Sequence, residues 1–206
     1  MNNALPIEDL SKTYLEHSMV INNFVIKIGS QIKDSLCRVF GDGVQYEWRE
    51  NDDKIITPDV SIICNLRDRK NISFTGIPRF VMEVLSNATE DYDRHEKMDI
   101  YCKVGVSEYW IVDWRKKSVE IYLFDFREDG TGYPYLYKTV TAQNKDELQL
   151  VMFPNLKITF DELFDLGRII NIYRKVSWKL HVALSCCFHF QSFKFYLSYR
   201  NSSRKG

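Results

Sequence analysis

Two acidic residues stand in segments that are otherwise apolar. Glu83 lies within the run 79–85, and Asp59 follows Pro58 at the start of a second short apolar run. A carboxylate buried in such a strand must be paired, bind a cation or become protonated. If the two strands are neighbours, both carboxylates can reach one ion, and carboxylate oxygens with water and a backbone carbonyl are ligands that Mg²⁺ prefers. Asp59 and Glu83 are therefore candidate metal ligands.

A lysine lies in the helix that is expected after Glu83. Lys97 shares a helix face with Asp93 and Tyr101, which lie four residues before and after it. Beside a metal ion, an ammonium group can orient a water and stabilise negative charge that grows on a phosphate. A structural interpretation is also open, because a strand carboxylate and a helix lysine often form only a salt bridge. An Asp–Lys pair at this spacing is also usually part of a solvated helix face.

The elements that must position these residues predict a mixed α/β domain with one sheet. An apolar residue at every fourth position predicts a helix over 14–40, which Gly41 and Gly43 would end. The nearly continuous apolar run 79–85 is typical of a central strand covered on both faces. Further strands are expected at 44–48, 58–64, 108–113, 118–124, 135–141 and 148–152, and a charged loop at 65–73.

Two further helices have recognisable ends. Thr89 is expected to cap a helix that runs to about Lys103, with Gly105 after it. Thr159 and Glu162 have the spacing of a capping box, which predicts a short helix that ends near residue 166.

The charge of the chain divides it into two parts. The 206 residues include 28 Lys and Arg and 28 Asp and Glu, but residues 167–206 hold eight of the basic residues and none of the acidic ones. We therefore expect a domain over 1–166 with a net formal charge of −8, and a basic, aromatic extension over 167–206 with a charge of +8. The extension could contact nucleic acid, dock a partner or remain solvated.

The cysteines and the amino terminus indicate the compartment. Five scattered cysteines without a Cys-x-x-Cys pair argue against a disulfide scaffold and a zinc ribbon, so we expect them to be reduced. No signal peptide is visible, and no apolar run approaches the length of a membrane helix. The sequence predicts a cytoplasmic protein that does not contact a membrane.

The residues around Glu83 resemble those of the Uma2 family of restriction-endonuclease-like proteins. The resemblance covers about residues 14–166 and is densest over 79–113, where residues 80–89 and 105–113 carry it together with Asp93, Lys97 and Tyr101. It implies the fold of the PD-(D/E)XK nucleases, an α/β fold whose mixed central sheet is flanked by helices, here with a long amino-terminal helix. It also implies hydrolysis of DNA phosphodiester bonds with Mg²⁺ or Mn²⁺.

The resemblance also implies roles for single residues. Asp59 matches the Asp of the family's Pro-Asp motif, and Glu83 matches the second acidic position, so both would bind the metal together with the backbone carbonyl of Val84. The nuclease motif normally has a lysine two residues after that acid, where this chain has Leu85, and the family pattern points instead to Lys97 as the catalytic lysine. Supporting positions are Ser86, Asp93, Tyr101, Tyr109 and Asp113.

The start of the family's first helix falls on Glu16 and His17, and Glu16 is a further candidate acidic ligand. This chain has less sequence before that helix than the family usually has, and its extension has no counterpart in the family pattern.

Three classes of function follow from these observations. The first is a Mg²⁺-dependent endonuclease acting on DNA, for which a homodimer is an option because nucleases that cut both strands often pair. The second is a non-enzymatic module of the same fold that binds DNA or protein. A small-molecule enzyme is less well supported, since the sequence has no Gly-x-Gly-x-x-Gly, Walker or Gly-x-Ser-x-Gly motif. The acidic body weakens the case for DNA, and the basic extension could supply the missing positive charge.

Overall fold

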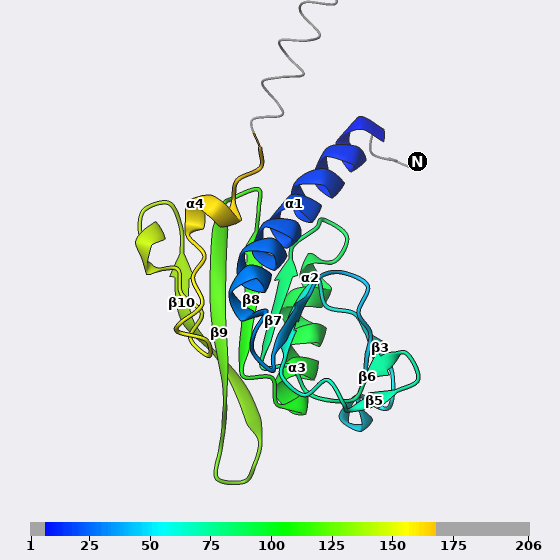
Figure 1. Ribbon diagram of the computed structural model, residues 1–206. Coiled ribbons are helices and arrows are strands. Elements are labelled where there is room, and N and C mark those ends of the chain that lie inside the picture. Colours follow the sequence, from blue (N-terminus) through cyan, green and yellow to red (C-terminus); the bar gives the residue numbers. More distant parts are fainter. Residues whose placement is uncertain (1–6, 168–206) are drawn as a thin grey trace, which may run out of the picture. The chain divides into compact units, whose positions relative to one another are not determined.

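The computed structural model describes residues 7–167, so the basic extension lies outside the described residues apart from its first residue. The elements belong to one compact unit, Met1–Asp165 (Figure 1). In chain order they are α1 (Ile7–Ile32), β1 (Arg38–Phe40), β2 (Tyr46–Glu47), the 3₁₀ turn η1 (Arg49–Asn51), β3 (Ile55–Ile56), β4 (Val60–Ile63), β5 (Arg69–Lys70), β6 (Ser73–Phe74), β7 (Phe80–Val84), α2 (Glu90–Tyr92), the π-helical segment η2 (Asp93–Lys97), α3 (Met98–Val104), β8 (Glu108–Asp113), β9 (Ser118–Phe126), β10 (Gly132–Val140), the 3₁₀ turn η3 (Lys145–Glu147) and α4 (Phe160–Leu163).

A six-stranded mixed sheet forms the centre of this unit. Its strand order is β1-β4-β7-β8-β9-β10, and only β7 and β8 among these neighbours run parallel. Every residue of β7 is buried, as its apolar sequence predicted, and every residue of β8 is buried as well. The chain returns from β7 to β8 through α2, η2 and α3, which is the crossover that two parallel strands require.

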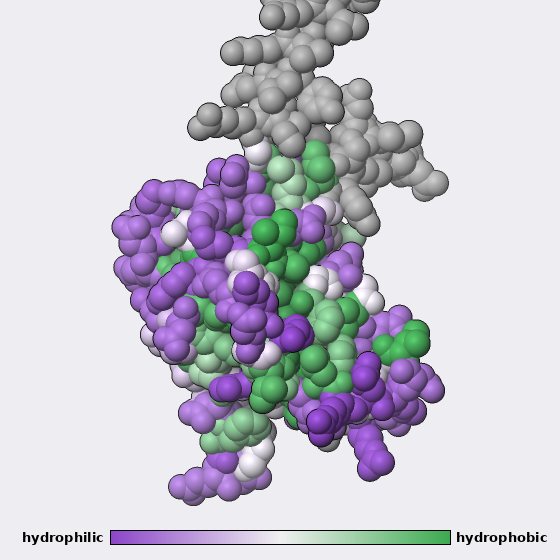
Figure 2. All heavy atoms as spheres, in the orientation of Figure 1, coloured by the Kyte–Doolittle hydropathy of each residue, from purple (hydrophilic) through white to green (hydrophobic). Residues whose placement is uncertain are grey.

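Helices cover both faces of the central strands. On one face, Phe24 of α1 stacks on Phe80 with ring centroids 5.1 Å apart and meets Trp110 edge-on. On the other face, Tyr101 of α3 packs against Tyr109 of β8. The sheet is therefore the middle layer of three. In the view of Figure 2, apolar residues gather in the middle of the surface and hydrophilic residues lie on both sides.

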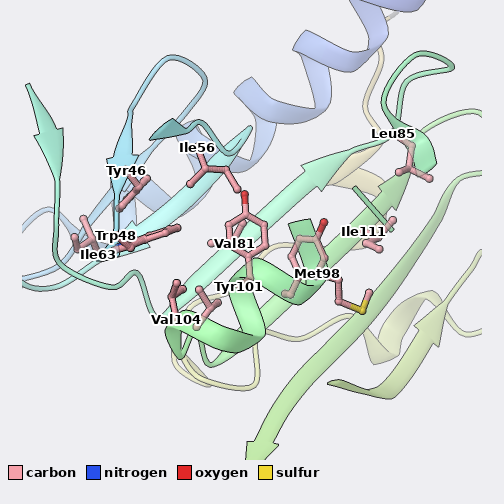
Figure 3. Packing of buried hydrophobic residues seen from close by; sticks show 12 residues of the cluster. Tyr46, Trp48, Ile56, Ile63, Val81, Leu85, Met98, Tyr101, Val104 and Ile111 are labelled. Atoms are coloured by element: carbon pink, nitrogen blue, oxygen red, sulfur yellow. The ribbon is translucent and has the colours of Figure 1, made fainter. Parts of the chain in front are cut away.

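A second, four-stranded sheet packs beside α3. Its order is β3-β2-β6-β5. Tyr46 and Ile56 of this sheet, with Trp48 just after β2, join a buried cluster that also contains Tyr101 and Val104. Figure 3 shows these side chains together, with Tyr101 between the helix and the strands. Burial of side chains of this size contributes about 1.5–3 kcal/mol each as an upper estimate. The cluster therefore fixes the position of α3, and α3 fixes Tyr101.

The amino-terminal helix differs from the prediction over 14–40. It spans Ile7–Ile32, and Leu36, which continued the apolar repeat, is 85% exposed. Residues 38–40 instead form β1, where Val39 pairs with Ile62 of β4. The carbonyl of Ile32 accepts hydrogen bonds from both the amide and the hydroxyl of Ser35, and the chain leaves the helix there. Gly41 and Gly43 therefore follow a strand and do not end the helix.

Other segments differ from the predictions as well. The strand expected at 44–48 is limited to β2, and the loop expected at 65–73 contains the short antiparallel pair β5 and β6. No strand is described at 148–152. There the amides of Val151 and Met152 donate to the buried carboxylate of Glu108, at 3.0 and 2.7 Å, instead of to a neighbouring strand.

The expectation of five reduced cysteines is wrong for one pair. Cys37 and Cys64 form a disulfide, because the antiparallel register that sets Arg38 opposite Ile63 also brings the adjoining cysteines together. The separation of 27 positions along the chain hides this pairing in the sequence. Cys102 is free and buried, and Cys186 and Cys187 lie outside the described residues.

No helix in the described range 7–167 is long and apolar enough to cross a membrane.

Candidate active site

Asp59 and Glu83 meet where β4 lies against β7. These strands are antiparallel with Val60 opposite Met82, so Asp59, one residue earlier, lies opposite Glu83. The amide of Asp59 donates to Oε2 of Glu83 at 3.2 Å, and the amide of Val84 donates to Oδ2 of Asp59 at 2.7 Å. The structure therefore brings the two predicted carboxylates together, beside the backbone of Val84.

Lys97 reaches this pair from the helical layer. Its Nζ lies 2.9 Å from Oε2 of Glu83 and 3.0 Å from Oδ1 of Asp93, and its side chain is only 11% exposed. Both Asp93 and Lys97 belong to the π-helical segment η2, and such segments are frequent at functional sites. The Asp93–Lys97 pair is therefore not the solvated helix face that its spacing usually indicates.

Two tyrosine hydroxyls hold Glu83 and Asp93 from the core side. The hydroxyl of Tyr101 donates to Oε1 of Glu83 at 2.6 Å, and the hydroxyl of Tyr109 donates to the backbone carbonyl of Asp93 at 2.9 Å. Both tyrosine side chains are fully buried. Rotation of the Glu83 side chain would leave the Tyr101 hydroxyl without its partner, whereas the bond from Tyr109 holds the backbone of Asp93 in place.

Thr89 occupies the N-cap position of α2, as predicted, but the turn that leads into the helix is held by Ser86. Its hydroxyl accepts from the amide of Thr89 at 3.2 Å, and its carbonyl accepts from the amide of Glu90. The hydroxyl of Thr89 donates instead to Oδ2 of Asp93 at 2.8 Å. The prediction is therefore right about the position of Thr89 and wrong about its side chain, which makes no capping bond and instead helps to hold Asp93 beside Lys97.

Asp113 has a structural role in the turn after β8. Its carboxylate accepts from the amides of Arg115 and Lys116 and forms an ion pair with the Arg115 guanidinium. Partial burial raises the pKa of this carboxyl, but the bonds from Arg115 and Lys116 outweigh it and keep the pKa below its usual value.

The cluster carries more negative than positive charge. Asp59, Glu83 and Asp93 face the single ammonium of Lys97, and Glu83 is fully buried. Burial raises the pKa of Glu83 to about 8, with help from the charges of Asp59 and Asp93, although Lys97 acts in the opposite direction. Burial also raises the pKa of Asp93. Burial alone would lower the pKa of Lys97, but the carboxylates of Glu83 and Asp93 raise it above its ordinary value.

His17 is a site residue to which the sequence assigned no role. Its Nε2 lies 3.2 Å from Oδ2 of Asp59, and its ring also contacts the backbone of Val84. Burial lowers the pKa of His17, but the contacts with Asp59 and with the Val84 carbonyl raise it more, so the pKa lies above its usual value. The sequence did hold a signal for this position. His17 lies four residues before Ile21, which is buried, so His17 lies on the same face of α1 as Ile21.

Glu16 lies next to His17 on α1. Its Oε2 is buried and accepts no hydrogen bond from the part of the chain that the structure describes. A buried carboxylate oxygen without a donor is suited to a cation or a bound water. The role of Glu16 as an additional acidic ligand of the site stays a prediction.

The donor chemistry of the site fits a hard divalent cation. With His17 neutral and all three carboxyls ionised, two negative charges would remain beyond the Lys97 ammonium. A divalent ion would balance them and so favour the ionised form of Glu83, which burial alone disfavours. Within the described residues, no three side chains of His, Cys, Asp or Glu are arranged as a complete metal site. The ligands of such an ion would therefore include the carbonyl of Val84 and water, as Mg²⁺ commonly has.

Comparison with known proteins places this geometry in a family. The model of the Uma2 family, described as "Putative restriction endonuclease", matches residues 7–161, which contain all the site residues discussed above. The chain belongs to the Uma2 family. This confirms the resemblance seen in the sequence, and membership in the family supports a nuclease-like function.

Two individual proteins are similar to this Uma2 chain. An uncharacterized protein of Synechocystis is 41% identical over 94 residues, which are 45% of this chain and 46% of that protein, so the chain matches about half of its length. The crystal structure of "a putative nuclease belonging to DUF820" from Anabaena variabilis has a TM-score of 0.53 at 19% identity, over 73% of this chain and 81% of that one. This likeness confirms the predicted fold class, a mixed sheet flanked by helices with a long amino-terminal helix.

Proposed function

We propose that this Uma2 chain is an endonuclease that hydrolyses phosphodiester bonds in DNA with a bound Mg²⁺ or Mn²⁺ ion. The observation that carries the proposal is the convergence on one oxygen of Glu83. The amide of Asp59 and the ammonium of Lys97 both reach its Oε2, from different layers of the fold. Acid, acid and lysine are the three groups that the family resemblance implies, and they come from positions 59, 83 and 97.

The side chains of the cluster have distinct roles in this proposal. Asp59 and Glu83 hold the cation together with the Val84 carbonyl, and a bound divalent ion supplies a water of lowered pKa and polarises a phosphate oxygen. Lys97 remains protonated between Glu83 and Asp93, so its ammonium can orient the attacking water or stabilise the charge that grows on the phosphate. Asp93 and Tyr101 keep Lys97 and Glu83 in these positions.

Binding of DNA needs positive charge that the domain lacks. Residues 1–166 carry a net formal charge of −8, and phosphate contacts by Lys and Arg supply most of the affinity for DNA. We propose that the +8 extension 167–206 supplies part of that charge, and its aromatic residues could stack on unpaired bases. Its predicted contact with DNA falls outside the described residues. The homodimer and the cytoplasmic location stay predictions.

One observation favours a second candidate, a nuclease-fold module that binds DNA or protein without cleaving it. Both carboxylate oxygens of Glu83 already have partners within the protein. Oε1 accepts the hydroxyl of Tyr101, and Oε2 accepts the amide of Asp59 and pairs with the ammonium of Lys97. Such a closed network can serve structure alone.

Metal binding and plasmid nicking on the same samples separate the two candidates. Calorimetric titration with Mg²⁺ and Mn²⁺ should show binding by the wild-type protein and none by Asp59→Asn/Glu83→Gln. The control is Asp52→Asn/Glu128→Gln, which removes the same charge from two exposed positions. Wild type and control should nick supercoiled plasmid, and the site variant should not. Nicking by the site variant, or no metal binding by the wild type, would contradict the nuclease; binding without nicking of double- or single-stranded DNA would favour the module.

A further inference from the structure

His17 contacts two of the groups that are proposed to hold the cation. Its Nε2 lies 3.2 Å from Oδ2 of Asp59, and the ring also forms a hydrogen bond with the backbone carbonyl of Val84. An ionised carboxylate and a carbonyl can only accept hydrogen bonds, so the imidazole is the donor in both contacts. His17 therefore bonds to the proposed ligands of the cation and not to the cation itself.

The two oxygens of the Asp59 carboxylate have different surroundings. Oδ2 accepts the amide of Val84 at 2.7 Å and also the imidazole of His17. Among the described residues, none donates a hydrogen bond to Oδ1, and the Asp59 side chain is 18% exposed. A single hydrogen bond leaves a carboxylate free to turn about the bonded oxygen, whereas two donors from different elements fix its plane. Oδ1 is therefore the oxygen that is held open for a cation.

The amino-terminal helix does not need His17 to hold it on the sheet. Phe24 is fully buried and stacks on Phe80, and Val20 and Ile28 of α1 are fully buried as well. These apolar contacts fix the orientation of α1. His17 lies seven residues before Phe24, on the same face of the helix. A rigid element thus presents the imidazole to the site.

We propose that His17 is a positioning residue, which keeps Oδ1 of Asp59 and the carbonyl of Val84 directed towards the cation. The inference rests on the proposed function, because it needs the cation that these groups are proposed to hold. Outer partners that orient metal ligands typically change the affinity for the metal by about 10–100-fold. Because the imidazole bonds to the ligands and not to the ion, its effect should be of the same size for Mg²⁺ and Mn²⁺.

Two substitutions separate positioning from packing. His17→Gln keeps an N–H donor, whereas His17→Leu keeps an apolar side chain on the inner face of α1 without any donor. Calorimetry should show that His17→Leu weakens the binding of Mg²⁺ and of Mn²⁺ by the same factor, about 10–100-fold, and that His17→Gln retains most of the affinity. A residue that only packs α1 on the sheet would give the reverse order. His95→Leu, at an exposed position of the same domain, should bind both ions as the wild type does.

A measurement on the histidine itself does not depend on how the His17 variants fold. Long-range proton–nitrogen NMR spectra report whether each imidazole nitrogen carries a proton. Nε2 of His17 should be protonated without metal and also with saturating Mg²⁺, because it donates to Asp59 in both states. The variant His95→Gln/His181→Gln/His189→Gln, in which His17 is the only histidine left, assigns the signal.

The outcomes separate this inference from the function on which it rests. Wild-type affinity in His17→Leu, an equal loss in both His17 variants, or a loss for one of the two ions only would overturn the positioning role and leave the proposed nuclease intact. An unprotonated Nε2 in the Mg²⁺-bound protein would do the same. Binding of neither ion by the wild type would overturn both.

Discussion

Lys97 lies 2.9 Å from Glu83 in space although it follows Glu83 by fourteen residues in the chain. The usual nuclease motif places its lysine two residues after the acid, on the same strand face. Here that position is Leu85, which is fully buried in the hydrophobic cluster with Tyr101 and Ile111. The ammonium group therefore reaches the acid from a helix while an aliphatic side chain fills the position on the strand.

The raised pKa of Glu83 predicts that the metal-free protein loses stability as the pH rises. Between its ordinary pKa of 4.5 and its folded value of about 8, the folded state binds more protons than the unfolded state, so the free energy of unfolding falls across this window. The raised pKa of His17 acts in the same direction. We expect a loss on the order of a few kcal/mol between pH 5.5 and 8 with EDTA present, measured by urea unfolding.

The variant Glu83→Gln tests the source of that pH dependence. An amide cannot ionise, and its NH₂ group can face Tyr101, whose hydroxyl can accept as well as donate. The free energy of unfolding should therefore fall much less steeply with pH in this variant. Glu128→Gln, at an exposed position, should keep the wild-type slope. Equal slopes in wild type and Glu83→Gln would show that another group is responsible.

Removal of the ammonium group should destabilise the protein strongly. Lys97→Met leaves the buried carboxylates of Glu83 and Asp93 without their cation, and loss of one partner from a buried pair costs about 3–5 kcal/mol. The cost should be smaller at pH 5.5, where these carboxyls can be protonated. Unfolding in urea at both pH values measures it. Lys103→Met, on the exposed side of α3, is the control, and similar stability of the two variants would disprove the pairing.

Removal of the Tyr101 hydroxyl should lower the stability of the protein and change the titration of Glu83. Tyr101→Phe removes the donor to Oε1 of a fully buried carboxylate, which costs about 1–3 kcal/mol. Because that bond lowers the pKa of Glu83, its loss should also move the pH-dependent fall in stability to higher pH. Tyr122→Phe, which removes a half-buried hydroxyl from Glu120, should cost less and leave the pH profile unchanged. A wild-type profile in Tyr101→Phe would contradict the assigned bond.

The disulfide predicts a redox-dependent stability. Linking two residues that are 27 positions apart stabilises a protein by about 3.5 kcal/mol in the chain-entropy description. Cys37→Ser/Cys64→Ser should therefore unfold at lower urea concentration, and reductant should have little further effect on this variant. Peptide mapping without reduction should find residues 37 and 64 in one linked fragment. Only separate fragments, each with a free thiol, would show that the bond does not form.

The sequence predicted those parts of the molecule whose local pattern follows from burial. β7 was recognisable because a strand covered on both faces is almost continuously apolar, and β8 was also expected as a strand. The capping box at Thr159 formed as its spacing indicated. Glu83 was conspicuous for the same reason, as a charge inside such a strand.

Features that depend on contacts between distant segments could not be predicted in this way. The register of β1 against β4 pairs Cys37 with Cys64, and the carboxylate of Glu108 takes the amides that a strand at 148–152 would have used. His17 reaches Asp59 because α1 packs along β7, with Phe24 on Phe80 and His17 beside Val84. In each case the partner lies more than 25 residues away.

The outer strand β10 limits how two copies of this chain could associate. It contains Pro134, which has no amide hydrogen to donate, and its pairing with β9 is irregular between Leu136 and Lys138. A proline, an irregular register and an outward lysine are devices that prevent a sheet edge from adding another strand. The opposite edge, β1, is three residues long. A dimer would therefore pack faces or loops against each other and would not form one continuous sheet through both molecules.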